Sequence, residues 1–209
     1  MKKNPTKDLI VEAAIKLFNN KGFNGTSIRD IAGLANVNIA NISYYFNGKQ
    51  GLLEYCYINF FEGYLEQLEY AYLEKNDSSK EKLKKSVEAI MSYQCKNIQL
   101  TRFILREVTI DSQIVREIMS TYYVKEKYIF TKILESGIEK KEFNQMSISY
   151  SIIQLKGLLS MPFIHSYYLT DVLHVFVNEV YFEKKYINEI YNWIDKVLCI
   201  NTSELSIIN

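Results

Sequence analysis

The sequence predicts an all-α protein in which a small group of three helices precedes a longer helical bundle. Its 209 residues include only eight glycines and two prolines, so residues that interrupt helices are rare. Apolar residues also recur at helical spacing from the first segment onward. In that segment they are Leu9, Ile10, Ala13, Ala14, Leu17 and Phe18.

Residues typical of helix ends divide the first part of the chain into short helices. Thr6 can cap the first helix, and Gly22 can end it because glycine readily adopts the left-handed conformation. Ser27 is expected to open a second helix that ends near Ala35. Asp30, three residues after Ser27, can complete a capping box with it.

A short turn at 36–37 is expected to separate the second helix from a third. Asn38 can cap this third helix, which should run to about Phe46 with Ile42 on its inner side. Three short helices with a tight turn between the last two form the tri-helical type of helix-turn-helix. A plain three-helix bundle would show the same periodicity, so the pattern alone leaves both interpretations open.

The outward side of the third helix favours the helix-turn-helix. A solvated helix face usually carries Lys and Glu, but this one has no charge before Lys49. Small, amide, hydroxyl and aromatic side chains suit contacts with base edges and phosphates. The residues expected on this face are Ile39, Ala40, Asn41, Ser43, Tyr44 and Tyr45.

The charge distribution and the cysteines indicate which partners and which cellular compartment the protein has. Residues 1–51 hold seven basic and three acidic side chains, a net charge of +4, whereas the remainder has a net charge of −3. A basic N-terminal part suits contact with phosphates. The three cysteines lie far apart and the N-terminal residues lack the apolar core of a signal peptide, which predicts a cytoplasmic protein with reduced thiols.

Beyond Lys49 the sequence predicts almost continuous helix. Residues 76–79 are expected to break the first long helix and cap the next one. Pro162 should end or kink its helix, because proline lacks an N–H group and clashes with the preceding turn. The helices are expected over about 49–74, from 79 to about 100, and over 101–109, 112–141, 147–163 and 182–199.

The last helix carries an apolar band too wide for packing on one side. One part is expected to face the core and another to face a second copy of the chain, in a four-helix, two-fold interface with the helix over 147–163. Large aromatic side chains should fill most of the bundle, leaving at most a narrow cavity. The band comprises Tyr186, Ile187, Ile190, Tyr191, Trp193, Ile194, Val197 and Leu198.

The stretch from Gly22 to Ala32, followed by Val37, by 42–46 and by Lys49, resembles the DNA-binding part of TetR-family regulators. The resemblance covers residues 6 to about 53. It implies a TetR-like architecture with a helix-turn-helix DNA-binding domain at 1–48 and a helical-bundle dimerisation and ligand domain at 49–209. One departure is Ser43, at a position that is usually aromatic in the family.

The same resemblance implies roles for individual residues. The third helix would enter the major groove of double-stranded DNA, beginning at Asn38. Phosphate contacts would come from Thr26, Ser27, Tyr44, Tyr45 and Lys49. Base contacts would come from Arg29, Ile39, Ala40, Asn41 and Ser43.

The implied partners follow from the family as well. The chain would act as a homodimer on a palindromic or near-palindromic site, most simply as a transcriptional repressor located on the nucleoid. A small-molecule effector or a cell-division protein are further partners that the sequence leaves open. No cofactor, metal or membrane is expected. The identity of the operator and of the effector is not encoded in any visible motif.

A more specific resemblance concerns the run from Val37 to Phe46 with Gly48-Lys49 and Gly51-Leu52. This run is similar to RefZ-type members of the family, from spore-forming bacilli, which bind motifs around the chromosome and influence the placement of the division ring. It makes chromosome binding of that kind the alternative to ordinary repression.

Two other classes of protein are less favoured. The sequence has no glycine-rich phosphate loop, nucleophile elbow or HExxH motif, and its only histidines are His165 and His174, which argues against an enzyme. A membrane-surface or scaffold protein would need the aromatic residues of 55–64 to be exposed. They wrap around their helix, so a buried connector is the simpler interpretation.

Overall fold

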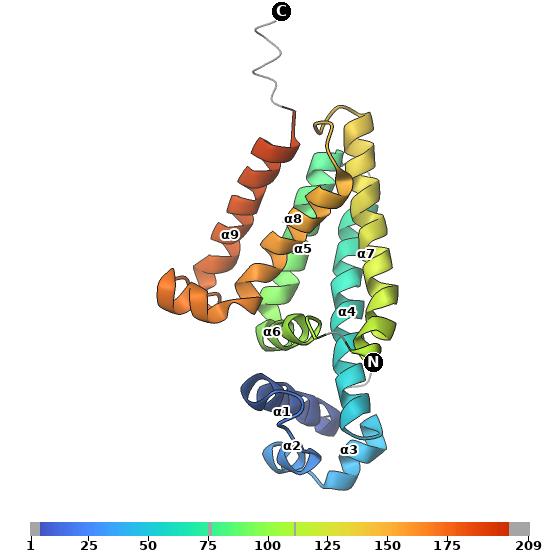
Figure 1. Ribbon diagram of the computed structural model, residues 1–209, viewed down its shortest axis with the longest axis vertical. Coiled ribbons are helices and arrows are strands. Elements are labelled where there is room, and N and C mark those ends of the chain that lie inside the picture. The colour runs from blue at the N-terminus through green and yellow to red at the C-terminus, as the bar shows by residue number, and fades with distance from the viewer. Residues whose placement is uncertain (1–4, 75–76, 111, 201–209) are drawn as a thin grey trace, which may run out of the picture. The chain divides into compact units, whose positions relative to one another are not determined.

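The computed structural model describes residues 5–74, 77–110 and 112–200, and within these it consists of helices without any strand (Figure 1). The all-α prediction is therefore confirmed. The first four helices are α1 (Pro5–Lys21), α2 (Ile28–Ala35), α3 (Ile39–Phe46) and α4 (Lys49–Leu73). They are followed by α5 (Ser79–Lys96), α6 (Ile98–Glu107), α7 (Gln113–Glu139), α8 (Ile148–Ile164) and α9 (Val180–Trp193). Two short π-helical segments are η1 (Tyr168–Val172) and η2 (Ile194–Leu198).

The chain divides into two compact units. The head unit comprises Met1–Glu62 and Asn97–Ser120, and the body unit comprises Gly63–Lys96 and Thr121–Asn209. The head unit thus contains α1, α2, α3 and α6 together with the first parts of α4 and α7. The expected functional boundary between residues 48 and 49 is a different division, and it stays a prediction.

The ends of the first helices follow mostly from local chemistry. Gly22 has a φ of 73° and its N–H donates to the carbonyl oxygen of Phe18 at 3.0 Å, so it ends α1 as predicted. Asn36 adopts the left-handed conformation after α2, with a φ of 53°. The cap predicted at Thr6 is wrong, because the described helix already includes Pro5.

Both predicted caps of the helix-turn-helix are present. Ser27 Oγ accepts from Asp30 N at 3.1 Å, and Asp30 Oδ2 accepts from Ser27 N at 2.9 Å, which is a complete capping box. Asn38 Oδ1 accepts from Ala40 N at 2.9 Å and opens α3. These bonds satisfy backbone donors that the first helical turns leave free.

The core of the head unit lies between α1, α2, α3 and α6. Ile10, Phe18, Ile31 and Ile42 are fully buried in it. The ring of Phe18 stacks on that of Phe103 from α6, with 5.0 Å between the centroids. Polar bonds reinforce this contact: Arg106 Nη2 donates to Phe18 O at 3.0 Å, and Asn19 Nδ2 donates to Gln99 O at 2.8 Å.

In the body unit, α5 contacts both α8 and α9 (Figure 1). The helix start was predicted correctly, since Ser78 and Glu81 form a second capping box with Ser78 N donating to Glu81 Oε2 at 2.8 Å. Where α4 passes α5, a Cβ at Gly63 would lie 2.6 Å from the hydroxyl of Tyr93. A larger residue than glycine would therefore displace the end of the Tyr93 side chain.

The buried carboxylate of Glu126 joins three helices of the body unit through an ion pair and a hydrogen bond. Glu126 of α7 is buried, and its Oε1 accepts from Lys156 Nζ of α8 at 2.7 Å. The hydroxyl of Tyr64 from α4 donates to the same carboxylate oxygen. Burial, followed by the nearby carboxylate, raises the pKa of Tyr64 well above its usual value, so this hydroxyl stays protonated and acts as a donor.

Pro162 lies inside α8 rather than at its end. A proline has no N–H to offer the carbonyl four residues earlier, which belongs to Leu158. The hydroxyl of Tyr186 from α9 donates to that carbonyl at 2.9 Å instead. The prediction that Pro162 ends or kinks the helix therefore missed a compensating bond from a distant residue.

Several boundaries differ from those predicted. α5 ends at Lys96, earlier than expected, and α6 starts after Asn97, whose amide favours helix ends over helix interiors. α9 begins at Val180 and ends at Trp193, where the helix widens into η2. The segment η1 had no counterpart in the sequence-based prediction, because single π-helical turns leave no periodicity of their own.

Candidate nucleic-acid interface

The outer face of α3 presents the residues predicted for DNA contact. Ile39 is 43% exposed and Tyr44 is 81% exposed, which are high values for apolar and aromatic side chains. Ala40 and Ser43 are exposed as well, while Asn41 and Tyr45 are half-buried. On the opposite side of α3, Ile42 and Phe46 are buried in the head unit, and they hold the helix in place.

Two further predicted residues lie on the surface near the two helix starts. Arg29 is exposed in the first turn of α2, and Asn38 is exposed where its side chain caps α3. α2 contacts α3, and a turn containing Asn36 and Val37 connects them. This is the geometry of a helix-turn-helix, in which the second helix of the pair enters the major groove.

The side chains of two residues predicted to contact phosphates have hydrogen-bond partners within the head unit. The side chain of Thr26 is 1% exposed, and its hydroxyl donates to Gly22 O at 2.8 Å, so it stabilises the turn before α2 instead of facing solvent. The hydroxyl of Ser27 donates to Asp30 Oδ2 at 2.6 Å and is used in the capping box. Ser27 is nevertheless exposed.

Lys49 lies just beyond α3, as expected, and its ammonium has partners within the head unit. Its Nζ donates to Phe23 O at 2.9 Å and to Thr26 O at 2.8 Å, and it lies 4.4 Å from the ring centroid of Phe23. Lys49 therefore fastens the start of α4 to the turn between α1 and α2. An ammonium has three donors, so one is left for another acceptor.

A groove beside α3 includes residues that sequence reasoning missed. It has a volume of about 610 Å³ and is lined in part by Tyr44, Tyr45, Asn47 and Gln50. Asn47 ends α3 in the left-handed conformation, with a φ of 56°. The available signal was that uncharged amide side chains continue past the end of the helix up to the start of α4.

Charged side chains of the head unit contact groups both near to them and far from them in the sequence. The pKa of Asp30 is lowered, first by its hydrogen bonds with Ser27 and to a smaller extent by Lys21, whose Nζ lies 3.8 Å from Asp30 Oδ1. Lys7 Nζ lies 3.9 Å from the ring centroid of Tyr55, an attractive cation–π contact. Asp30 thus stays ionised, and its carboxylate accepts hydrogen bonds from Ser27 at the start of α2.

Other kinds of site find little support in the described part of the chain. No group of three or more His, Cys, Asp or Glu side chains there could hold a metal ion. None of the described helices combines the length and apolarity needed to cross a membrane. Tyr57, Phe60, Phe61 and Tyr64 are buried and Tyr55 is half-buried, so these side chains do not form the exposed surface that the membrane-surface interpretation requires.

The fold of α1–α3 defines a helix-turn-helix protein, and comparison with known proteins gives its family. Residues 10–56 match the family model "Bacterial regulatory proteins, tetR family". Over 205 residues the chain is 48% identical to the "Probable HTH-type transcriptional regulator YttP" of Bacillus subtilis (strain 168), which covers 98% of each chain. The chain therefore belongs to the TetR family of transcriptional regulators, which are not enzymes.

Two more comparisons concern a short part of the sequence and the overall fold. Over 48 residues, 23% of this chain and 26% of the relative, it is 42% identical to the "Biofilm operon icaADBC HTH-type negative transcriptional regulator IcaR" of Staphylococcus aureus (strain Newman). The ketosteroid transcriptional regulator KstR2 of Mycobacterium tuberculosis shares the fold, with a TM-score of 0.81 at 12% identity over 96% of this chain and 98% of that one.

Proposed function

We propose that the protein is a homodimeric, sequence-specific repressor that inserts α3 into the major groove of a palindromic or near-palindromic site in chromosomal DNA. The observation that carries this proposal is the uncharged, exposed face of α3 in an otherwise basic part of the chain. The name of IcaR as a negative regulator supports repression. We place the protein in the cytoplasm, bound to the nucleoid.

The base-reading residues in this proposal are Arg29, Ile39, Ala40, Asn41 and Ser43. Asn41 is the best single test, because an amide can make two hydrogen bonds to an adenine edge. Ile39 would contact a thymine methyl group. Tyr44 and Tyr45 would contact phosphates through their hydroxyls, with Asn38 at the groove edge. Thr26 and Ser27 act indirectly, by shaping the turn and the start of α2.

The test is to select bound sites from random DNA and then to compare variants on the preferred site and on unrelated duplexes. Asn41→Ala should lose about 1–3 kcal/mol of binding free energy on the preferred site and relax one base position. Asn20→Ala removes the same amide from an exposed position on α1 and should bind like the parent protein. Equal losses by Asn41→Ala on preferred and unrelated DNA would contradict the assignment.

A homodimer is supported by the outward face of α8. Tyr150 is 70% exposed and Ile153 is 64% exposed, and nothing lies within 4 Å of a Cβ placed on Gly157 one turn further along. In the predicted band on α9 and η2, half of the residues are buried in the core, and among the others only Val197 is exposed. α8 would thus provide more of the apolar contact between copies than α9.

Sedimentation of the full chain tests this arrangement. The parent protein should be a dimer at micromolar concentration, and Ile153→Asp should shift it toward monomer because a charge would be buried at the interface. Asn188→Asp places the same charge on an exposed α9 position and should leave the dimer intact. A parent protein that is monomeric yet binds its site tightly would contradict the homodimer.

RefZ-type chromosome binding is the alternative function. It is supported by the run from Val37 to Phe46 and by the similarity along nearly the whole chain to a Bacillus protein. In this case a cell-division protein would be a partner. Mapping bound sites on the genome separates the two: sites grouped around the replication origin favour this alternative, and a single site beside a promoter favours repression. A small-molecule effector stays a prediction in either case.

A further inference from the structure

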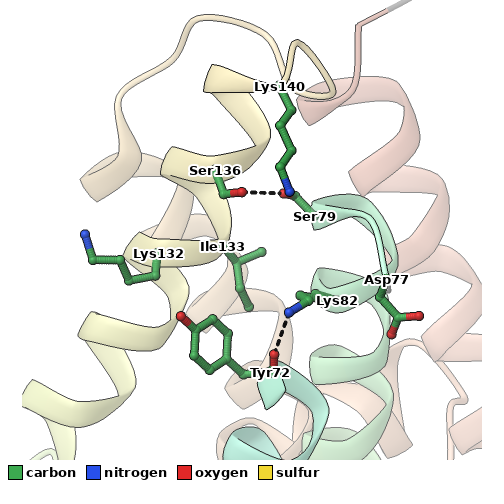
Figure 2. A pocket seen from close by; sticks show the side chains of 8 residues that line it. All are labelled: Tyr72, Asp77, Ser79, Lys82, Lys132, Ile133, Ser136 and Lys140. Atoms are coloured by element: carbon green, nitrogen blue, oxygen red, sulfur yellow. Dashed lines mark hydrogen bonds between the residues drawn. The ribbon is translucent and has the colours of Figure 1, made fainter. Parts of the chain in front are cut away.

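A polar pocket opens in the body unit between the end of α4, the start of α5 and the end of α7 (Figure 2). Its volume is about 480 Å³, which lies in the range of small-molecule sites. Three lysines from two of these regions line it together with hydroxyl groups. They are Lys82, Lys132 and Lys140, with Ser79, Ser136 and Tyr72.

Lys82 places one positive charge in the pocket. Its Nζ donates to Tyr72 O at 2.8 Å, at the end of α4, and lies 5.3 Å from the centroid of the Tyr72 ring (Figure 2). Neither partner is a carboxylate, so the charge of Lys82 is not neutralised by them. Two of the three ammonium donors remain for a ligand.

Lys140 brings the second positive charge from the end of α7. In Figure 2 its side chain extends in the direction of Ser79 and Ser136. Across residues 5–74, 77–110 and 112–200, no hydrogen bond or ion pair of its ammonium is found. Ser79 Oγ donates to Ser136 Oγ at 3.2 Å, which leaves the proton of the Ser136 hydroxyl for another acceptor.

Two acidic side chains at the pocket are paired with lysines other than Lys82 and Lys140. A third, Glu142 beside the start of α5, accepts from Lys80 N at 2.9 Å. Asp77 Oδ2 lies 2.7 Å from Lys85 Nζ, and in Figure 2 this carboxylate points away from Lys82. Lys132 lines the pocket with its stem, while its Nζ is 2.8 Å from Glu135 Oε2. The pocket therefore keeps the two charges of Lys82 and Lys140, although the chain beyond residue 51 is acidic overall.

We propose that this pocket binds a small molecule with a diphosphate group, held by the ammonium groups of Lys82 and Lys140. The hydroxyls of Ser136 and Tyr72 would donate to the phosphate oxygens. Two cations and two hydroxyl donors on separate helices match an anion with many oxygens better than a single carboxylate. The volume also exceeds what one phosphate fills, which leaves room for the second phosphate and part of an attached group.

Calorimetric titration of the full chain with inorganic pyrophosphate tests the proposal, with citrate at equal ionic strength as a carboxylate probe. Pyrophosphate should bind saturably and more tightly than citrate. Lys82→Gln and Lys140→Gln should each lower the affinity about tenfold, because each removes a charge-assisted hydrogen bond. Lys184→Gln makes the same charge change at an exposed position of α9 and should keep the parent affinity.

Three results would overturn the proposal: no saturable binding of pyrophosphate, equal affinity for citrate, or an equal loss of affinity in Lys184→Gln. Thermal unfolding of each variant shows whether it is folded. Because Lys82 also binds the end of α4, Lys82→Arg provides a second variant that keeps the charge and the donors. This variant should retain binding, and its failure to bind while folded would also contradict the assigned role.

Discussion

The head unit and the body unit hold their helices in place by different means. In the head unit, side chains cap the two short helices of the helix-turn-helix, as Ser27 does for α2 and Asn38 for α3. In the body unit, α7 and α8 are joined by the ion pair of the buried Glu126 with the half-buried Lys156. Both units also depend on contacts between residues far apart in the sequence, as Arg106 with Phe18 shows in the head unit. The difference is that only the body unit adds an ion pair with a buried carboxylate.

The two units nevertheless share one device. The capping box of Ser27 and Asp30 in the head unit has a counterpart in Ser78 and Glu81 in the body unit. A capping side chain contributes about 1 kcal/mol to the free energy of unfolding. Removing one partner of a buried ion pair lowers the free energy of unfolding by more than that. The two units therefore share helix caps and differ in the other interactions that stabilise them. Mutations in each unit can test this difference.

The largest effect is expected for Lys156→Met in the body unit. It leaves the carboxylate of Glu126 buried without its cation, which should lower the free energy of unfolding by about 3 kcal/mol in urea denaturation. The double variant Glu126→Gln with Lys156→Met should recover part of this loss, because no buried charge remains. A loss below about 0.5 kcal/mol, as for an ordinary surface pair, would remove the distinction between the two units.

Lys49→Met in the head unit should cost about 2 kcal/mol, since a charged donor is lost from two backbone carbonyls. Binding to DNA should then weaken only as far as the head unit unfolds. The slope of log affinity against log salt should stay the same, because the role is structural. A slope reduced by about one unit with unchanged stability would instead show a phosphate contact.

Ser27→Ala and Ser78→Ala compare the same device in both units. Each should lower the free energy of unfolding by about 1 kcal/mol, because each removes the acceptor for an N–H in the first helical turn. Matched thermal and urea unfolding of the two variants measures the difference. A much larger loss for one of them would mean that its cap is coupled to the surrounding packing rather than acting locally.

The smallest effect concerns pH and the cap of α2. The pKa of Asp30 is lowered in the folded chain, mainly by Ser27, so its contribution is present above the unfolded value near 3.8 and is lost as the pH falls through the lower folded value. The stability difference between the parent protein and Asp30→Asn should therefore disappear in acid. An unchanged difference there would show that the carboxylate charge is not what the cap uses.

Much of the fold could be predicted because the signals lie within a few residues of the helix ends. Gly22, Ser27 and Asn38 each act on a backbone group that is near in sequence, and all three were predicted correctly. The break at Asn97 was misplaced because an apolar pattern continues on both sides of it. The partners of Glu126 could not be predicted, since Tyr64 and Lys156 are 62 and 30 residues away.

The candidate site shows the same limit. The exposed face of α3 follows from its periodicity, so Ile39, Ser43 and Tyr44 lie on the surface as expected. Lys49 binds carbonyls 26 and 23 residues earlier, a contact that no local pattern indicates. The burial of Thr26 was missed for a related reason, because a hydroxyl in a turn is polar in sequence whether it faces water or a nearby carbonyl.

The bond from Tyr186 to the carbonyl that Pro162 leaves free fixes the register of α9 against α8. If α9 slid by one turn, this hydroxyl would move about 5 Å along α8 and the carbonyl would lose its donor. A proline that would weaken an isolated helix thus helps to set the position of the neighbouring helix along α8. Because α8 also carries the exposed apolar face, the same hydrogen bond sets where α9 lies beside that face.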